Sequence, residues 1–101
     1  MTAKKVDRNQ AEIVKAYRDL GFSVYSCAPM GKGFPDLVVG IYGITDLVEV
    51  KDGEKPPSAR KLTPDQVTFF NDWKGSVRVV NNIDDVAAHY KELRKYWMGG
   101  K

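Results

Sequence analysis

Apolar and polar positions recur along this chain with two different periods. Over residues 9–20 the apolar side chains return every three or four positions, as on one face of a helix: Ile13, Val14, Ala16, Tyr17 and Leu20. Gly21 follows and is a suitable residue to end that helix. Residues 22–26 alternate instead and favour a strand, and the proline and two glycines within residues 28–33 can continue neither element. We therefore predict a helix, a strand and a loop.

Two further apolar segments follow, at residues 37–41 and 45–51. The short stretch between them, residues 42–44, contains a glycine, which is typical of a β-hairpin turn. The two segments are therefore predicted to be neighbouring antiparallel strands. The next stretch, residues 52–61, contains Gly53, two prolines and five charged side chains, and this composition indicates an exposed loop.

A second helix is predicted to begin after Thr63. The hydroxyl of Thr63, the proline at position 64 and the amide of Gln66 together form the pattern of a capping box. This helix ends near Gly75, and its apolar residues are expected in the core: Val67, Phe69, Phe70 and Trp73.

The last part of the chain predicts a short strand at residues 77–80 and a third helix capped by Asn82. The helix has apolar residues at a spacing of three or four and ends at residues 98–100: Ile83, Val86, Ala87, Tyr90, Leu93 and Trp97. The connection from Glu49 to Val80 is long enough for a helical crossover, so the fourth strand is expected to run parallel to the third. The predicted fold class is a small α/β sandwich with the order αβββαβα and a mixed sheet.

Composition limits the possibilities further. A chain of 101 residues, 43% hydrophobic and 29% charged, fits one folded globular domain covering residues 1–101 and does not suggest disorder. The net charge of +3 permits a polyanionic partner without establishing one. Cys27 is the sole cysteine, which excludes an internal disulfide. The first ten residues lack the apolar core of a signal peptide, and no apolar run approaches the ~20 residues of a membrane span, so we expect a soluble, cytoplasmic protein.

Acidic residues interrupt the two apolar segments of the predicted hairpin. Asp36 follows a proline, and thirteen positions later comes Glu49, followed by Val50 and Lys51. Strand alternation places Glu49 and Lys51 on one face. The apolar residues on either side of Glu49 suggest burial on both faces, where a carboxylate is costly unless it is paired or binds a metal.

An ordinary structural explanation stays open for each of these residues. Asp36 could simply follow a proline at the entrance of a strand. Glu49 and Lys51 could form the solvated face of an edge strand. The combination points elsewhere, because phosphodiester hydrolysis needs a cation that offsets phosphoryl charge and activates water. Two carboxylates and one backbone carbonyl are an adequate protein contribution to a magnesium site, and Lys51 could hold the attacking water.

Pro35-Asp36 with Glu49-Val50-Lys51 resembles the motif of the PD-(D/E)XK nuclease superfamily. Four segments are similar to its VRR-NUC branch, in the stand-alone, phage-type form that is itself similar to Holliday-junction resolvases: residues 9–13 (NQAEI), 33–37 (GFPDL), 47–53 (LVEVKDG) and 62–66 (LTPDQ). The resemblance implies a restriction-endonuclease-like αβββαβ(α) sandwich with a mixed central sheet.

The resemblance also implies a role for each motif residue. Asp36 and Glu49 would bind Mg²⁺ or Mn²⁺, the carbonyl of Val50 would complete the protein ligands, and Lys51 would assist the attacking water. No nucleotide cofactor is implied.

Two further residues have competing explanations. Glu12 would join the metal site from the first helix, directly or through water, although one position from Ile13 it could equally be a solvated helix flank. Gln66 matches a glutamine that the family places beside its active site, and the capping box alone would also explain it.

The implied function is a divalent-metal-dependent endonuclease that cuts branched DNA, at Holliday junctions or flaps, by shape. Because a resolvase makes paired cuts, a homodimer is expected, acting in the cytoplasm of its own cell or, for a phage protein, of the host. Two alternatives stay open: a junction-binding module with little or no cleavage of its own, and a metal-free interaction domain.

Other candidate residues have weaker signals. His89, the only histidine, is expected at the surface or its boundary, and Cys27 is expected to be a small buried side chain. Four basic residues in the predicted loops could contact phosphates or be ordinary solvated surface: Lys32, Lys55, Arg60 and Lys61.

Overall fold

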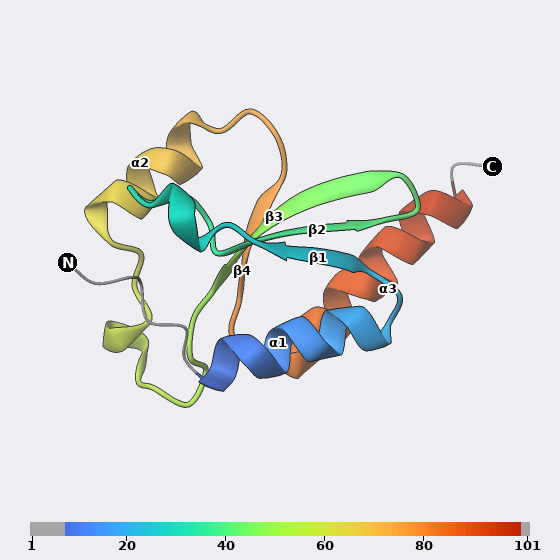
Figure 1. The fold of residues 1–101 in the computed structure, drawn as a ribbon, viewed down its shortest axis with the longest axis horizontal. Coiled ribbons are helices and arrows are strands. Elements are labelled where there is room, and N and C mark those ends of the chain that lie inside the picture. The colour runs from blue at the N-terminus through green and yellow to red at the C-terminus, as the bar shows by residue number, and fades with distance from the viewer. Residues whose placement is uncertain (1–7, 100–101) are drawn as a thin grey trace.

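The fold is an α/β arrangement of one four-stranded mixed sheet and three helices, drawn in Figure 1. The computed structural model describes residues 8–99. The elements follow in the predicted order: α1 (Arg8–Asp19), β1 (Ser23–Ser26), β2 (Leu37–Ile41), β3 (Ile44–Val50), α2 (Pro64–Asp72), β4 (Val77–Val80) and α3 (Ile83–Gly99). Two short 3₁₀ helices, η1 (Ala28–Met30) and η2 (Pro57–Ala59), lie in stretches predicted as irregular loops. None of the helices within residues 8–99 is long and apolar enough to cross a bilayer.

The sheet has the strand order β1-β2-β3-β4. β1, β2 and β3 are successively antiparallel, and β4 runs parallel to β3, as the long crossover predicted. The β2–β3 turn has only two central residues, Tyr42 and Gly43, with φ of 56° and 77°. Positive φ at both central positions is the conformation that matches the twist of a hairpin, and it fixes the register with Leu37 opposite Val48.

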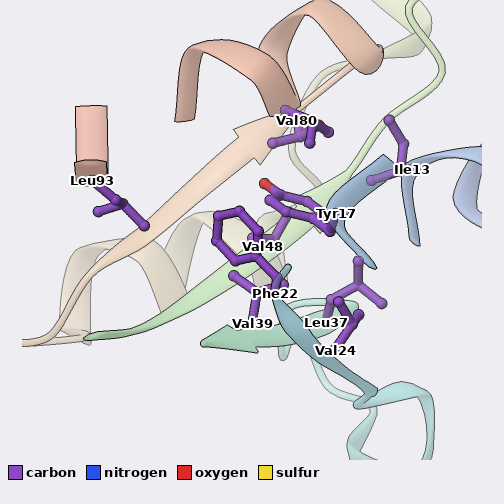
Figure 2. Close-up of a cluster of buried hydrophobic side chains, with 10 residues drawn as sticks. Ile13, Tyr17, Phe22, Val24, Leu37, Val39, Val48, Val80 and Leu93 are labelled. Atoms are coloured by element: carbon purple, nitrogen blue, oxygen red, sulfur yellow. The ribbon is translucent and has the colours of Figure 1, made fainter. Parts of the chain in front are cut away.

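The hydrophobic core lies between one face of the sheet and helices α1 and α3, which pack against each other. Figure 2 shows the side chains that meet there: Ile13, Tyr17, Phe22, Val24, Leu37, Val39, Val48, Val80 and Leu93. In β3 the even-numbered side chains, such as Val48, point into this core. The odd-numbered ones, such as Glu49, therefore point to the opposite face, where α2 lies.

The expected burial of α2 is wrong. Val67 and Trp73 are 43% and 42% exposed, and Phe69 and Phe70 are only half-buried. These side chains have no place in the main core because α2 lies on the other side of the sheet from α1 and α3. Phe69 instead packs between Phe34, at 5.1 Å, and Trp73, at 5.3 Å between ring centroids.

The third helix is also less buried than its spacing predicted. Val86 and Leu93 lie in the core, but Ile83, Ala87 and Trp97 are exposed. At 17 residues, α3 is the longest helix, and its last turns project beyond the sheet (Figure 1). A helical period identifies the apolar face of a helix, but it does not show whether a neighbouring element covers the whole length of that face.

Candidate functional site

Two buried carboxylates meet where β2 begins and β3 ends. Asp36 directly precedes Leu37, which pairs with Val48, so extending this register by one residue sets Asp36 opposite Glu49. Opposite residues in an antiparallel pair share a face, with Cβ atoms roughly 4.5–5.5 Å apart. Asp36 is 4% exposed and Glu49 is 2% exposed. Oδ2 of Asp36 accepts a hydrogen bond of 2.9 Å from the backbone N–H of Val50, which fixes its carboxylate against the end of β3.

Lys51 and Gln66 complete a polar cluster around Glu49. The ammonium of Lys51 lies 3.5 Å from Oε2 of Glu49 and donates a hydrogen bond of 2.9 Å to Oε1 of Gln66. The amide nitrogen of Gln66 donates to the same Glu49 oxygen at 2.8 Å. The structure therefore brings together the four side chains that the sequence placed at the site from three separate segments: Asp36, Glu49, Lys51 and Gln66.

Gln66 is held by the start of the helix that carries it. Its backbone N–H donates to Oγ1 of Thr63 at 3.2 Å, and its Oε1 accepts from the backbone N–H of Thr63 at 2.9 Å, so the predicted capping box is confirmed. Gln66 is nevertheless buried on an otherwise exposed first turn. The same Oε1 accepts from the N–H of Thr63 and from the ammonium of Lys51, so the capping residue also contacts the cluster around Glu49.

The loop before Asp36 fits closely against the start of α2. Gly33 has a φ of +81°, and a Cβ added there would lie 2.5 Å from the backbone carbonyl of Asp65. Only glycine allows both the left-handed conformation and this approach. The contact, with the packing of Phe34 on Phe69, positions Gln66 above the ends of β2 and β3.

The structure places Glu12 beside the segment that follows Lys51. Glu12 is exposed on α1 and lines a polar pocket of about 160 Å³ together with Asn9, Asp52 and Glu54. Asn9 donates from its side chain to the carbonyl of Lys51 at 2.6 Å, which ties the start of α1 to the end of β3.

The donor set at the ends of β2 and β3 fits a hard cation. Within residues 8–99, no group of three or more His, Cys, Asp and Glu side chains is arranged to hold a metal. Asp36 and Glu49 offer two carboxylates, and the adjacent carbonyl of Val50 would add a third oxygen. Mg²⁺ accepts such a partial set because it keeps several waters, whereas Zn²⁺ favours the Cys and His ligands absent from this cluster. Lys51 brings one positive charge to two buried carboxylates, and a bound cation would compensate the negative charge that remains.

A second buried polar chain lies on the opposite face of the sheet, and sequence reasoning missed it. His89, expected at the surface, is 1% exposed: its Nε2 lies 2.7 Å from Oδ2 of Asp46, and its Nδ1 lies 2.8 Å from the hydroxyl of Tyr17. Because a carboxylate only accepts, Nε2 carries the proton and Nδ1 accepts from Tyr17. Burial lowers the pKa of His89 and raises the pKa of Tyr17. The signal was available, since Asp46 shares the strand face of Val48.

Cys27 lies close to the carboxylate pair but does not resemble a nucleophile. Its backbone N–H donates to the carbonyl of Asp36 at 2.7 Å. Burial, with a smaller contribution from the charge of Asp36, raises the pKa of its thiol. The thiol therefore stays protonated at neutral pH, and the half-buried side chain serves packing.

The basic residues of the two loops stay near the solvent. Lys32, Lys55 and Lys61 are exposed. Arg60 is half-buried and donates from Nε to the carbonyl of Lys55 at 2.8 Å, which shapes the loop after β3. These cations flank the segments that carry Asp36 and Gln66 and are open to a polyanion.

Comparisons with models of protein families, with curated proteins and with solved structures find no match for this chain. The resemblance carried by the motif residues therefore stays a prediction. The chemistry open to this site depends on how Asp36, Glu49, Lys51 and Gln66 lie relative to one another.

Proposed function

We propose that this protein is a divalent-metal-dependent endonuclease that hydrolyses phosphodiester bonds in branched DNA, with a restriction-endonuclease-like fold of the VRR-NUC type. One observation carries the proposal: Asp36 and Glu49 are both buried where the central strands β2 and β3 begin and end, with the ammonium of Lys51 held beside Glu49. Burying two carboxylates together is unfavourable for folding alone, and such arrangements concentrate at functional sites.

The metal would be Mg²⁺ or Mn²⁺, held by Asp36, Glu49 and the carbonyl of Val50. Such an ion supplies positive charge for the phosphoryl oxygens and lowers the pKa of a bound water. Asp36 is already oriented for this task by the N–H of Val50, which engages Oδ2 and directs the carboxylate toward the end of β3.

Lys51 would position the attacking water or stabilise the charge that develops on the phosphate. Its ammonium has three N–H donors. One donates to Gln66, and a second lies toward Glu49 at 3.5 Å, so the third can be directed at a water or a phosphate oxygen. Gln66 would act as a positioning residue, because its amide separates Lys51 from a closer ion pair with Glu49.

DNA shape would determine the substrate, since the single sheet and its three helices carry no additional recognition element within residues 8–99. Exposed Lys32, Lys55 and Lys61 would contact phosphates on both sides of the scissile bond. Paired cuts at a junction require two sites, so we include a homodimer in the proposal.

A junction-binding module with little cleavage is the second candidate. It is favoured by the hydrogen bonds of the cluster itself, because Gln66 connects Oε2 of Glu49 to the ammonium of Lys51 and so gives this polar cluster a structural role. Binding would then depend on the loop cations and fall steeply with salt.

The test is cleavage of a four-way junction, a flap and a plain duplex with Mg²⁺, Mn²⁺ or EDTA. We expect the parent protein to cut branched DNA with either metal, and Asp36→Asn and Glu49→Gln to lose cleavage while still binding. Asp84→Asn, at an exposed acid of α3, is the matched control and should cut like the parent. Binding by the parent without cleavage under any metal would favour the second candidate. A parent that neither binds nor cuts would disprove both.

A further inference from the structure

An aromatic groove lies at the opposite end of the β2–β3 hairpin from Asp36 and Glu49. The molecule is 47 Å long, and the β2–β3 turn and the end of α3 meet at one end, whereas α2 lies toward the other (Figure 1). At the α3 end, the rings of Tyr42 and Trp97 stack with centroids 4.7 Å apart and an interplanar angle of 12°. Together with Tyr96 they line an open groove of about 800 Å³.

The groove is not needed for the core. Leu93 is the last buried residue of α3, and the helix continues for a turn and a half beyond it. The side chains on that extension remain exposed, although they are large and apolar: Tyr96 at 74%, Trp97 at 43% and Met98 at 51%. Consecutive exposed aromatic residues beside a preformed stack are unusual on a protein surface and indicate a binding site.

The charge around the groove is positive. Lys91, Arg94 and Lys95 lie on the last turns of α3. The neighbouring acid, Glu92, is already engaged, because both of its oxygens accept hydrogen bonds from Arg78, at 3.3 and 2.8 Å. Arg94 donates to the hydroxyl of Tyr90 at 3.3 Å and is thereby held at the edge of the aromatic cluster.

Aromatic rings with flanking cations match single-stranded nucleic acid, whose bases stack on rings while its phosphates are neutralised by Lys and Arg. A second copy of this chain fits less well. A twofold interface would place the same surface on both partners, and Lys91, Arg94 and Lys95 would then face their own copies.

We propose that this groove binds a single-stranded segment of nucleic acid, with bases stacked on Tyr96 and Trp97 and phosphates contacted by Lys95 and its basic neighbours. The inference deepens the proposed function, since a flap carries such a segment, and it rests on that function only for the source of the strand. Binding at the groove requires neither a metal nor the carboxylate pair.

The two tryptophans of the chain lie in different places, which gives a site-specific readout. Trp73 is the C-cap of α2, the helix that carries Gln66, and Trp97 belongs to the groove. In Trp73→Phe the groove residue is the only tryptophan. We would titrate this variant, in EDTA, with a thymidine oligonucleotide of about 12 nucleotides, within the usual site sizes for single strands. We expect saturable quenching of Trp97 fluorescence that weakens with salt.

Tyr96→Ala, made in the Trp73→Phe background, should weaken this binding about tenfold, the usual scale of one lost stacking contact. Tyr25→Ala is the matched control, because Tyr25 is 73% exposed and lies on β1, outside the groove. It should bind like its parent.

The two proposals can fail separately. Quenching of Trp97 by a protein that cuts no DNA would disprove the nuclease and support the groove. Cleavage of a junction without any quenching of Trp97 would disprove the groove and leave the nuclease. The groove proposal would also be overturned if the oligonucleotide quenched only Trp73, measured in Trp97→Phe, or if sedimentation showed a dimer that Tyr96→Ala dissociates.

Discussion

The ammonium of Lys51 donates a hydrogen bond of 2.9 Å to the side-chain oxygen of Gln66, the same oxygen that caps α2. One amide therefore joins the start of a helix to the polar end of a strand. This helix makes few other contacts with the sheet, since its apolar side chains lie outside the main core. The stability of α2 and the geometry of the candidate site thus depend on the same hydrogen bonds.

Removing the hydroxyl that caps α2 should lower the stability of the protein more than it lowers the rate of DNA cleavage. Thr63→Ala deletes the acceptor for the N–H of Gln66 and should lower the free energy of unfolding by about 1 kcal/mol, the usual effect of a lost N-cap. Urea denaturation followed by circular dichroism measures this change. Thr68→Ala, at an exposed position within the same helix, is the control and should change stability little. An equal loss in both variants would mean that the hydroxyl does not act as a cap.

Replacing the amide should affect DNA cleavage much more than replacing the hydroxyl. In the parent protein the ammonium of Lys51 lies 3.5 Å from Glu49. In Gln66→Ala it can move closer to that carboxylate, and it is then no longer available to bind the attacking water or the phosphate. We expect cleavage to fall by roughly 10²-fold, as for other removed polar groups at a reacting centre. Single-turnover cleavage with saturating Mg²⁺ separates this effect from binding. Equal rates for Gln66→Ala and Thr63→Ala would restrict Gln66 to its capping role.

The glycine before the Pro-Asp pair should be sensitive for a steric reason. Gly33→Ala requires a Cβ 2.5 Å from the carbonyl of Asp65 and a left-handed backbone at the same residue. Gly43→Ala meets no atom within 4 Å but has a similar φ of +77°, so it isolates the conformational cost, roughly 1–2 kcal/mol. We expect Gly33→Ala to lose more stability than Gly43→Ala, and to lose cleavage because α2 must move. Denaturation and cleavage measured on both variants test this, and equal losses would show that the contact with α2 is unimportant.

The sequence predicted the order of elements and the meeting of Asp36 with Glu49, because both depend on local information. Periodicity identifies helices and strands, and a short turn fixes the register that sets Asp36 opposite Glu49. Burial of α2 was mispredicted because periodicity does not reveal which layer a helix joins. The location of His89 was mispredicted for a related reason, since its partner Asp46 lies 43 positions away on a strand whose face toward α3 is set by the tertiary fold.

The buried His89 should make stability depend on pH in a defined direction. Unfolded His89 takes up a proton as the pH falls through its ordinary pKa near 6.5, whereas burial lowers the pKa in the folded protein. Below pH 6.5 the unfolded state therefore binds more protons than the folded state. The free energy of unfolding keeps its full value above pH 6.5 and decreases as the pH falls below it. Urea denaturation at several pH values between 8 and 5.5 should show this decrease.

His89→Gln cannot titrate and should remove the slope, although it is expected to be less stable than the parent at pH 8 because it perturbs the contacts with Asp46 and Tyr17. Glu92, whose pKa is lowered by its hydrogen bonds with Arg78, contributes only at more acidic pH, below 4.5. A slope that persists unchanged in His89→Gln would assign the pH dependence to another group.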